Sequence, residues 1–518
     1  EEVNQTMNVP LTPSQKVQKL KASRDLLIAR CKLLTPYSQD WYLTRKQLQQ
    51  VTEEGEITAE QVRVHSLKAS FEKAYPDTAT SGNSRKDWQC PICREGFHEY
   101  LDDPSSWLPC CEQRICGNCR AQQSEHKKCP SCGSKQHFPL NKLDEVYKIQ
   151  DIEEPWAHLR MSLLLEENGR HEKAAEYLWK AVDEGHPIAI CQMGQAHYTG
   201  SNPNIPQSNE NARALFLKSA KQGYSEAQYN LGLFCLEEDM NEVDPPTTST
   251  QQLSRAVQAQ KQRQKIQIQQ EAVRWISLAA VGGSVSAQSM LATMYCNSMG
   301  QQVAPVKKNL FLAKYWAQQG AAAAVATKRG GDGSCQLILA QVLMILASQT
   351  FDGSYNQVGY NPIPRVMFLL RKTAAAGDDD DQNSSSSSSI QTETNKANAL
   401  KTLRNLEGQI SVKCANCNAQ NVPLSQCRQC RGVHYCSKAC STEHWKKGHK
   451  VDCLKKEETA ELEECLHKIS ISAPPAGTGL SAIAEELATP TAATSEIMVE
   501  PTTTQGASPM IWSGNALN

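Results

Sequence analysis

Apolar residues recur at helical spacing through most of this chain, and the pattern predicts a mainly α-helical protein. Near the N-terminus it predicts one helix over 17–34, ended by Pro36, and another over 58–75. Toward the C-terminus it predicts a short helix over 396–406 and a further helix within 455–468. At 518 residues the chain has room for several domains.

The middle of the chain holds an internal repeat, marked by a glycine that is followed four residues later by an alanine. The pairs are Gly185/Ala189, Gly223/Ala227, Gly283/Ala287 and Gly320/Ala324. An alanine-rich helical phrase precedes each glycine, which would supply the left-handed residue that stops the helix. Small residues let neighbouring helices approach closely, so we expect helix pairs stacked as a solenoid. An ordinary alanine-rich bundle would explain the helices but not the register of the pairs.

This repeat resembles the SEL-type repeats, relatives of the tetratricopeptide helix pairs. The phrase that carries the resemblance is Ala189-x-x-x-Met193-Gly194-x-x-x-Tyr198-x-Gly200. The resemblance implies a solenoid over 150–377, with an insertion at 239–270, whose concave face binds other proteins.

Polar and small-residue stretches separate the other regions. Residues 378–394 combine an aspartate run with a serine run, cannot pack a core, and are expected to form a flexible linker before the helix over 395–412. Residues 1–85 are expected to be a helical N-terminal region. The end of 455–518 is rich in proline, threonine, alanine and serine and is expected to be a disordered tail.

Net charge and hydropathy narrow the classes of partner. The formal net charge is −1, which gives no argument for nucleic acid or anionic membranes. The longest apolar run, 337–347, is too short to cross a bilayer, and no secretory segment is visible. Because the chain begins at Glu1 rather than methionine, an upstream segment stays open.

Cysteine usage changes this picture, because most of the 21 cysteines lie in two dense clusters at CxxC-type spacing. In a long, weakly charged chain such clusters indicate thiolate–metal ligation in a reducing compartment, cytoplasmic or nuclear, rather than disulfides. The scattered cysteines are expected to be small apolar fillers: Cys31, Cys191, Cys235, Cys296, Cys335 and Cys465.

The C-terminal cluster has the spacing of a double zinc site. Its candidate ligands are Cys414, Cys417, Cys427, Cys430, Cys436, Cys440, His449 and Cys453. About forty residues are too few to bury an adequate core, so metal is expected to supply the folding free energy.

This spacing, with Tyr435 beside the fifth cysteine and Trp445 ahead of the histidine, resembles the MYND zinc finger. The resemblance implies a finger over 413–454 that holds two structural zinc ions through interleaved ligands. One ion would take Cys414, Cys417, Cys436 and Cys440, and the other Cys427, Cys430, His449 and Cys453.

The MYND family binds short proline-containing peptides on a hydrophobic face beside the zinc. By resemblance, Tyr435, Ser437 and Trp445 would lie near that face, although Trp445 could equally form the small core of the finger. Basic residues around the finger raise the alternative of nucleic-acid binding. We favour it less, because cations offset the negative charge of a four-thiolate zinc site and no recognition helix is visible.

The N-terminal cluster, within 86–140, resembles a RING finger with two cross-braced zinc ions. One site would take Cys90, Cys93, Cys116 and Cys119, and the other Cys110, Cys111, Cys129 and Cys132. The family usually has a histidine shortly after the third ligand, where this chain continues from Cys110 with Cys111 and Glu112. Adjacent cysteines can both reach one ion only with a particular backbone bend, so Cys111 is the weakest ligand, with His98 and His126 as substitutes. One ion with spare thiols is the alternative.

Three functions remain open for this set of domains. The preferred one is a zinc-binding scaffold or adaptor with no catalytic residues, which recognises partner proteins through the solenoid and the MYND-like finger. The second is a ubiquitin ligase, since Ile92 and Pro130 match the positions where RING fingers dock a conjugating enzyme. However, 120–128 holds no tryptophan and Gly133 stands where active ligases often carry a basic residue. The third is a transcriptional co-regulator. A SET-type methyltransferase is not favoured, because no such motif is visible.

Overall fold

The structure is a computed structural model whose described residues form two compact units. The described residues are 11–36, 38–75, 107–108, 113–114, 155–200, 202, 204–241, 255–296, 306–326, 333–351, 362–375 and 387–472. The first unit holds the helices from α1 to α12, and the second holds α13 to α18. Among the described helices, none combines the length and apolarity needed to span a lipid bilayer.

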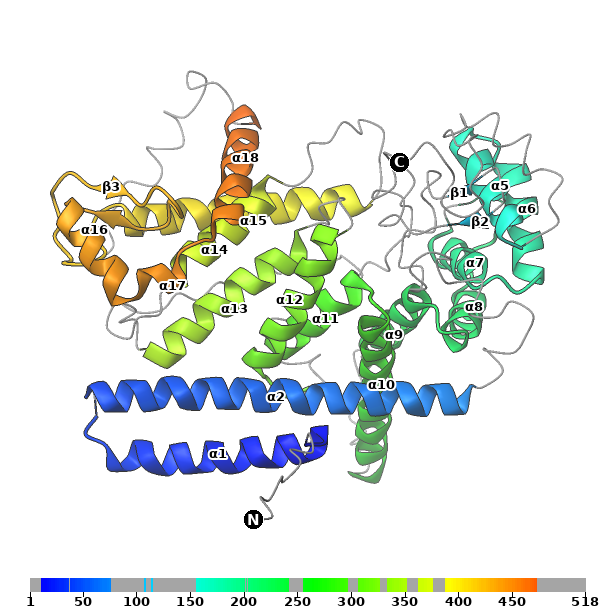
Figure 1. Cartoon of the computed structure of the whole chain (residues 1–518). Coiled ribbons are helices and arrows are strands. Elements are labelled where there is room, and N and C mark those ends of the chain that lie inside the picture. Colours follow the sequence, from blue (N-terminus) through cyan, green and yellow to red (C-terminus); the bar gives the residue numbers. More distant parts are fainter. Residues whose placement is uncertain are drawn as a thin grey trace, which may run out of the picture. The chain divides into compact units, whose positions relative to one another are not determined.

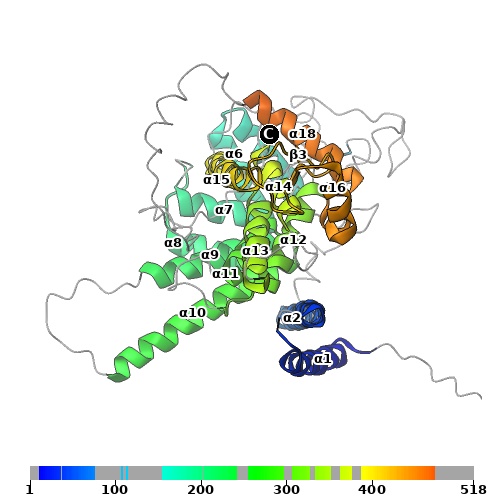
Figure 2. The ribbon, with the colours of Figure 1, turned by 90° about the vertical axis from the view of Figure 1, so that its left-hand side faces the viewer.

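Consecutive helices of the first unit stack as antiparallel pairs (Figure 1). The pairs are α5 (Pro155–Glu167) with α6 (His171–Asp183), α7 (Pro187–Thr199) with α8 (Asn209–Lys221), α9 (Ser225–Asn241) with α10 (Arg255–Val281), and α11 (Val285–Cys296) with α12 (Leu310–Ala326). Each pair packs against the next along the chain, which confirms the predicted helical solenoid. α10 begins inside the predicted insertion and extends well beyond the neighbouring helices (Figure 2).

The glycine–alanine register marks where these pairs join. Gly185, Gly223 and Gly283 have positive φ angles of 84°, 88° and 99° and lie between the second helix of one pair and the first helix of the next. The alanine four residues after each of them is fully buried. The expectation is wrong for Gly320, which lies inside α12. The alanines that follow it favour helix strongly enough to continue the helix through one glycine.

Two further glycines allow the helices of a pair to touch. A Cβ at Gly194 in α7 would lie 3.0 Å from the ring of Phe216 in α8. A Cβ at Gly232 in α9 would lie 2.5 Å from Cγ1 of Ile276 in α10. Both contacts are closer than side chains normally allow, so these helix pairs depend on glycine at these positions.

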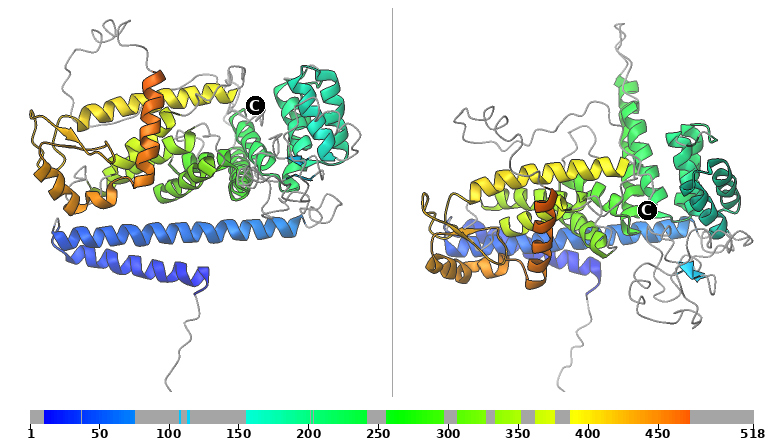
Figure 3. Two further views of the ribbon diagram at one scale, coloured as in Figure 1. Left: turned by 45° about the horizontal axis from the view of Figure 1, so that its top comes forward. Right: turned by 90° about the horizontal axis from the view of Figure 1, so that it is seen from above.

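The N-terminal region forms a helical hairpin of α1 (Pro13–Leu33) and α2 (Gln39–Ala74), which lie side by side (Figures 2 and 3). Thr12 closes the start of α1 with a capping box. α2 starts well before the predicted 58–75, because the Ser38 hydroxyl accepts a hydrogen bond from the amide of Trp41 and caps the helix there. α2 packs against α10 and α12 of the solenoid.

The predicted RING-like finger lies almost wholly outside the described residues. Those outside include Cys90, Ile92, Cys93, Cys110, Cys111, Cys116, Cys119, Cys129, Pro130 and Cys132. The described part of this region is one antiparallel pair of short strands, β1 (Trp107–Leu108) and β2 (Gln113–Arg114). The predicted tail beyond residue 472 is also outside the described residues.

Among the described residues, the second unit combines the C-terminal finger with four helices. These are α13 (Ser334–Phe351), α14 (Ile363–Ala374), α15 (Ser387–Ile410) and α18 (Lys456–Ser472), and α14 packs against the other three. α15 is longer than the predicted short helix and takes in residues 387–394 of the predicted linker. Directly after this added part, the Nδ2 of Asn395 donates a hydrogen bond to Ser334 Oγ at 2.9 Å, which ties α15 to α13.

The finger itself has little secondary structure. It contains the antiparallel strands β3 (Ser425–Gln426) and β4 (His434–Tyr435), the helix α16 (Lys438–His444), the π-helical turn η4 (Trp445–His449) and α17 (Lys450–Asp452).

Candidate metal centre

The eight predicted ligands of the C-terminal finger gather into two groups of four. Site 1 consists of Cys414, Cys417, Cys436 and Cys440, and site 2 consists of Cys427, Cys430, His449 and Cys453. Within each group all ligand atoms lie within 4.8 Å of one another. This is the interleaved grouping that the resemblance implies, in which each site joins the first and second halves of the finger.

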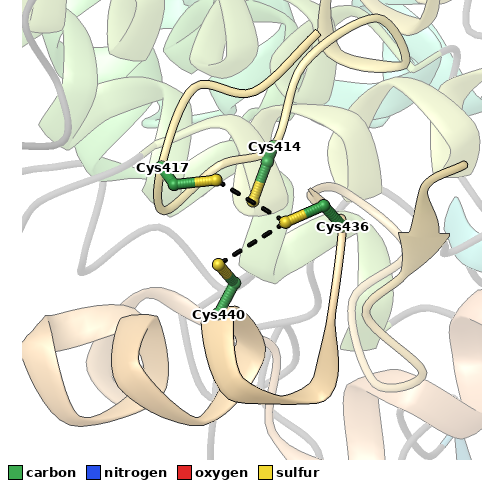
Figure 4. A group of neighbouring side chains, drawn as sticks. All are labelled: Cys414, Cys417, Cys436 and Cys440. Atoms are coloured by element: carbon green, nitrogen blue, oxygen red, sulfur yellow. Dashed lines mark hydrogen bonds between the residues drawn. The ribbon is translucent and has the colours of Figure 1, made fainter. Parts of the chain in front are cut away.

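Site 1 is built from two turns and the start of a helix (Figure 4). The Sγ of Cys436, directly after β4, lies 3.6 Å from that of Cys417 and 3.6 Å from that of Cys440. Cys440 is in the first turn of α16, and its amide donates a hydrogen bond to the hydroxyl of Ser437 at 3.2 Å. Ser437 is therefore the N-cap residue that orients the last ligand of this site.

Site 2 uses a histidine from the π-helical turn. The Nε2 of His449 lies 3.5 Å from Sγ of Cys427 and 3.7 Å from Sγ of Cys430. The Sγ atoms of Cys427 and Cys453 are 4.0 Å apart. Directly after the Cys430 ligand, Arg431 has a positive φ of 47°, and the amide of Gly432 donates a hydrogen bond to Cys430 Sγ at 3.4 Å. This turn therefore directs the amide of Gly432 toward the Sγ of Cys430.

These distances fit zinc. Tetrahedral zinc with bonds of about 2.3 Å to sulfur and about 2.0 Å to nitrogen separates two sulfurs by about 3.8 Å and sulfur from nitrogen by about 3.5 Å. The separations given above run from 3.5 to 4.0 Å. A disulfide would bring two sulfurs to about 2.0 Å, and none of the described cysteines is in a disulfide.

The electrostatics of site 2 also call for a cation. Hydrogen bonds from Cys430 and then Cys453 lower the pKa of Cys427 far below its usual range. The hydrogen bond with Cys427, followed by that with Cys453 and burial, raises the pKa of Cys430. Thiols this close cannot all ionise by themselves, because each thiolate opposes the next. A divalent cation removes the conflict, since it stabilises every thiolate at once.

Of the three residues expected on a peptide-binding face, only Trp445 presents a large apolar surface. It is 36% exposed, and its ring lies 5.9 Å from that of His449. Tyr435 is only 2% exposed, and its Oη lies 3.0 Å from Nδ1 of His444. Burial raises the pKa of Tyr435. Tyr435 therefore fills the core between the two sites, and its part in a peptide-binding face stays a prediction. Ser437 is exposed but is occupied as a helix cap.

The finger completes its core with side chains from two helices outside it. Phe368 of α14 and Leu462 of α18 are 3% and 0% exposed and belong to one apolar cluster with Val433, Tyr435 and Leu454. A domain of this size cannot bury enough apolar surface alone, so it uses the surfaces of its neighbours. Sequence reasoning missed these supports, although the strongly apolar face of α14 was a readable signal.

Polar contacts fix the same interface beside site 2. The guanidinium of Arg371 in α14 is 4% exposed and donates hydrogen bonds to Glu407 Oε1 at 3.0 Å and to the carbonyl of Arg431 at 3.4 Å. A Cβ at Gly432 would lie 2.8 Å from Cα of Pro364, so α14 presses directly on the turn that follows Cys430. Further ion pairs hold α18: Arg365 with Glu458, Lys372 with Glu461, and Arg431 with Glu463.

Comparison with protein families matches residues 414–453 to the MYND finger. Residues 187–224, 225–244 and 285–325 match the Sel1 repeat. No curated protein matches the chain.

Solved structures similar to this chain include a protective antigen present in uropathogenic Escherichia coli strains, which displays an SLR fold. It is 15% identical with a TM-score of 0.35, and the match covers 66% of this chain but only 54% of that protein's length. A Sel1 repeat protein from Oxalobacter formigenes is 18% identical with a TM-score of 0.30, and the match covers 50% of this chain and 93% of that one. From the family matches, this chain carries a MYND finger at 414–453 and Sel1 repeats between 187 and 325.

Proposed function

We propose that this protein is a zinc-dependent scaffold that recognises other proteins through its MYND finger and its Sel1 repeats. The observation that carries the proposal is the closed ligand set of each site. Four protein ligands per site leave no open coordination position for water or substrate, and closed sites of this kind are structural. The finger would therefore act as a rigid surface for recognition rather than as a metal catalyst.

In this role, site 1 and site 2 each hold one zinc ion. When bound, zinc supplies folding free energy of the order of 10–16 kcal/mol at comparable small sites. The residues of this chain do the rest: Ser437 orients Cys440, and Gly432 donates to the sulfur of Cys430. Trp445 directly follows α16, the helix that Ser437 caps, and lies partly exposed at the surface of the finger.

The partner of the finger is proposed by resemblance to be a short proline-containing peptide that packs on Trp445. The test is an array of proline-rich peptides probed with the full chain, alongside a Trp445→Ala variant. We expect the variant to retain zinc, measured per chain by elemental analysis, and to lose peptide binding. Equal binding by both chains, or zinc in neither, would refute the proposed role of the finger.

The ubiquitin-ligase hypothesis rests on residues outside the described part of the chain. Two zinc ions in the RING-like region, and a conjugating enzyme docked on Ile92 and Pro130, stay predictions from resemblance. Auto-ubiquitination by the purified chain, lost in an Ile92→Ala variant, would favour the ligase over the scaffold.

The abundance of clustered thiols also leads us to propose a reducing compartment, the cytoplasm or the nucleus. Fluorescence imaging of the tagged full chain tests this location. Exclusion from the nucleus would remove the co-regulator hypothesis and leave the scaffold unaffected.

A further inference from the structure

The helix α2 presents one stripe of acidic and apolar side chains to the solenoid. Glu53, Glu56 and Glu60 follow one another at spacings of three and four residues, and Val64 and Phe71 continue the same face. Val64 and Phe71 are 8% and 3% exposed, and the ring of Phe71 lies edge-on to Trp275 of α10 at 6.1 Å. The stripe is therefore the face by which α2 is bound.

The solenoid supplies one donor to Glu53 and one donor to Glu56. The Nζ of Lys314 in α12 lies 2.7 Å from Glu53 Oε1, and both side chains are about one-fifth exposed. The Nδ2 of Asn309, just before α12, donates to Glu56 Oε2 at 2.9 Å. Both interactions come from the end of the solenoid, and both recognise a carboxylate.

The third carboxylate is the buried centre of the interface. Glu60 is 3% exposed, and its Oε1 accepts hydrogen bonds from Tyr295 Oη of α11 and Trp316 Nε1 of α12, each at 3.2 Å. Arg63, one turn along α2, donates to both oxygens of Glu60 and to Ser277 Oγ of α10. Tyr295 and Trp316 therefore form a neutral, buried pair of donors that needs an acceptor from outside the solenoid.

The character of the contact indicates that it can open. Charged or hydrogen-bonding groups hold Glu53, Glu56 and Glu60, and Val64 and Phe71 add apolar contact farther along α2. Partly polar contacts between parts of one chain are typical of contacts that form and break. α2 ends at Ala74 and α5 begins at Pro155, so α2 is not the neighbour in sequence of the solenoid helices that it contacts.

We propose that the surface formed by Tyr295, Asn309, Lys314 and Trp316 is a binding site for an acidic helix, and that α2 occupies it as an internal competitor of a partner. The partner is an amphipathic helix with carboxylates at positions i, i+3 and i+7 and apolar residues at i+11 and i+18. This inference rests on the proposed scaffold function and names both the partner class of the Sel1 repeats and their regulation.

The test uses the full chain and a fluorescent peptide of its own residues 50–75, with binding followed by anisotropy. The wild-type chain should bind the peptide weakly, because α2 holds the site. A Glu60→Gln chain should bind it at least about tenfold more tightly, since its own α2 has lost charge-assisted hydrogen bonds. Adding Trp316→Phe to that chain should remove the gain, and a peptide with the Glu60→Gln change should bind about tenfold more weakly than the unchanged peptide.

Each outcome decides the proposal. If the Glu60→Gln chain keeps its helical circular dichroism and binds no more tightly than wild type, α2 is a permanent part of the fold and the proposal is wrong. If that chain unfolds, Glu53→Gln, at a position about one-fifth exposed, takes its place, with a smaller gain expected. Saturating peptide should also speed amide exchange in α2 of the wild-type chain, and unchanged exchange would refute displacement. Trp445→Ala should leave all these results unchanged, which separates this site from the finger.

Discussion

Arg371 links α14 to the metal-binding part of the finger through a single buried guanidinium. It donates to Glu407 and to the carbonyl of Arg431, the residue that follows the Cys430 ligand. A buried charge is costly to leave without its partners, so this residue ties the shape of site 2 to the position of α14. Arg371 is thus a positioning residue for a ligand that it does not touch.

We expect Arg371→Met to lower the free energy of unfolding of the second unit by about 1–3 kcal/mol, because the Arg431 carbonyl and the half-exposed Glu407 lose their donor. Metal occupancy should fall at site 2 and stay unchanged at site 1. Absorption of the cobalt-substituted protein measures this, since a site of four sulfurs and a site of three sulfurs and one nitrogen absorb differently. Arg428→Met is the matched control, because Arg428 is exposed on the same turn. Equal loss in both variants would contradict the positioning role.

Within the finger, single ligands act on both sites because the ligands interleave. Cys436 belongs to site 1, but it follows Tyr435, which packs between the sites against the rings of His444 and His449. Cys436→Ser should therefore abolish one zinc ion and weaken the other. Native mass spectrometry counts the ions, and Cys31→Ser, on α1 outside the finger, is the control that should change nothing. A variant that keeps site 2 at wild-type affinity would show that the two sites fold separately.

At the scale of elements, the packing of the helix pairs in the solenoid depends on how closely the helix backbones approach one another. The turns at Gly185, Gly223 and Gly283 reverse the chain between pairs, and the buried alanines that follow let adjacent pairs meet. Within a pair, Gly194 and Gly232 remove the side chain where the partner helix crosses. The glycines and alanines of the repeat therefore mark the positions where neighbouring helices come closest together.

Gly232→Ala tests this directly, because its Cβ would lie 2.5 Å from Ile276. We expect a loss of about 1–3 kcal/mol in unfolding free energy, as in other overpacked cores. Gly408→Ala is the matched control in α15: nothing lies within 4 Å of its Cβ, and alanine favours helix there. Urea denaturation of both variants should give opposite signs, and a stable Gly232→Ala chain would mean that α9 and α10 can separate freely.

At the scale of the whole molecule, the zinc finger is part of the second compact unit rather than an independent module. Phe368 and Leu462 complete its apolar core, and the charges of α14 pair with those of α18. The first unit has its own core, formed by the stacked helix pairs. Metal binding at the finger should therefore support the helices of its own unit.

Chelation of zinc should accordingly melt more than the finger. We expect amide exchange to rise in α14, α15 and α18 as well as in 414–453, with protection in α7–α11 retained. Hydrogen exchange read by mass spectrometry resolves these segments, and re-addition of zinc should restore protection. If the three helices keep their protection after the metal is removed, their stability does not depend on the folded finger.

Local signals predicted much of the fold and most of the candidate centre. The cysteine spacing indicated a double zinc site, the resemblance to the MYND finger implied the two ligand groups, and the glycine–alanine pairs indicated the solenoid. The same local reasoning was wrong at Gly320, where the following alanines continue the helix, and it shortened α15, whose first turns include the stretch expected to be a linker. Those outcomes depend on neighbours: Asn395 is held by Ser334 of α13, far away in sequence.

The sequence by itself determined which side chains can reach a common metal ion and where helices turn, because ligand spacing and glycine conformation act within a few residues along the chain. Only the tertiary structure decided what those elements pack against. It buried Tyr435, placed Arg371 behind site 2, and laid the carboxylates of α2 on the donors of α11 and α12. Many helices of this chain offer an apolar or charged face, and the choice among them is made by long-range complementarity that no local pattern contains.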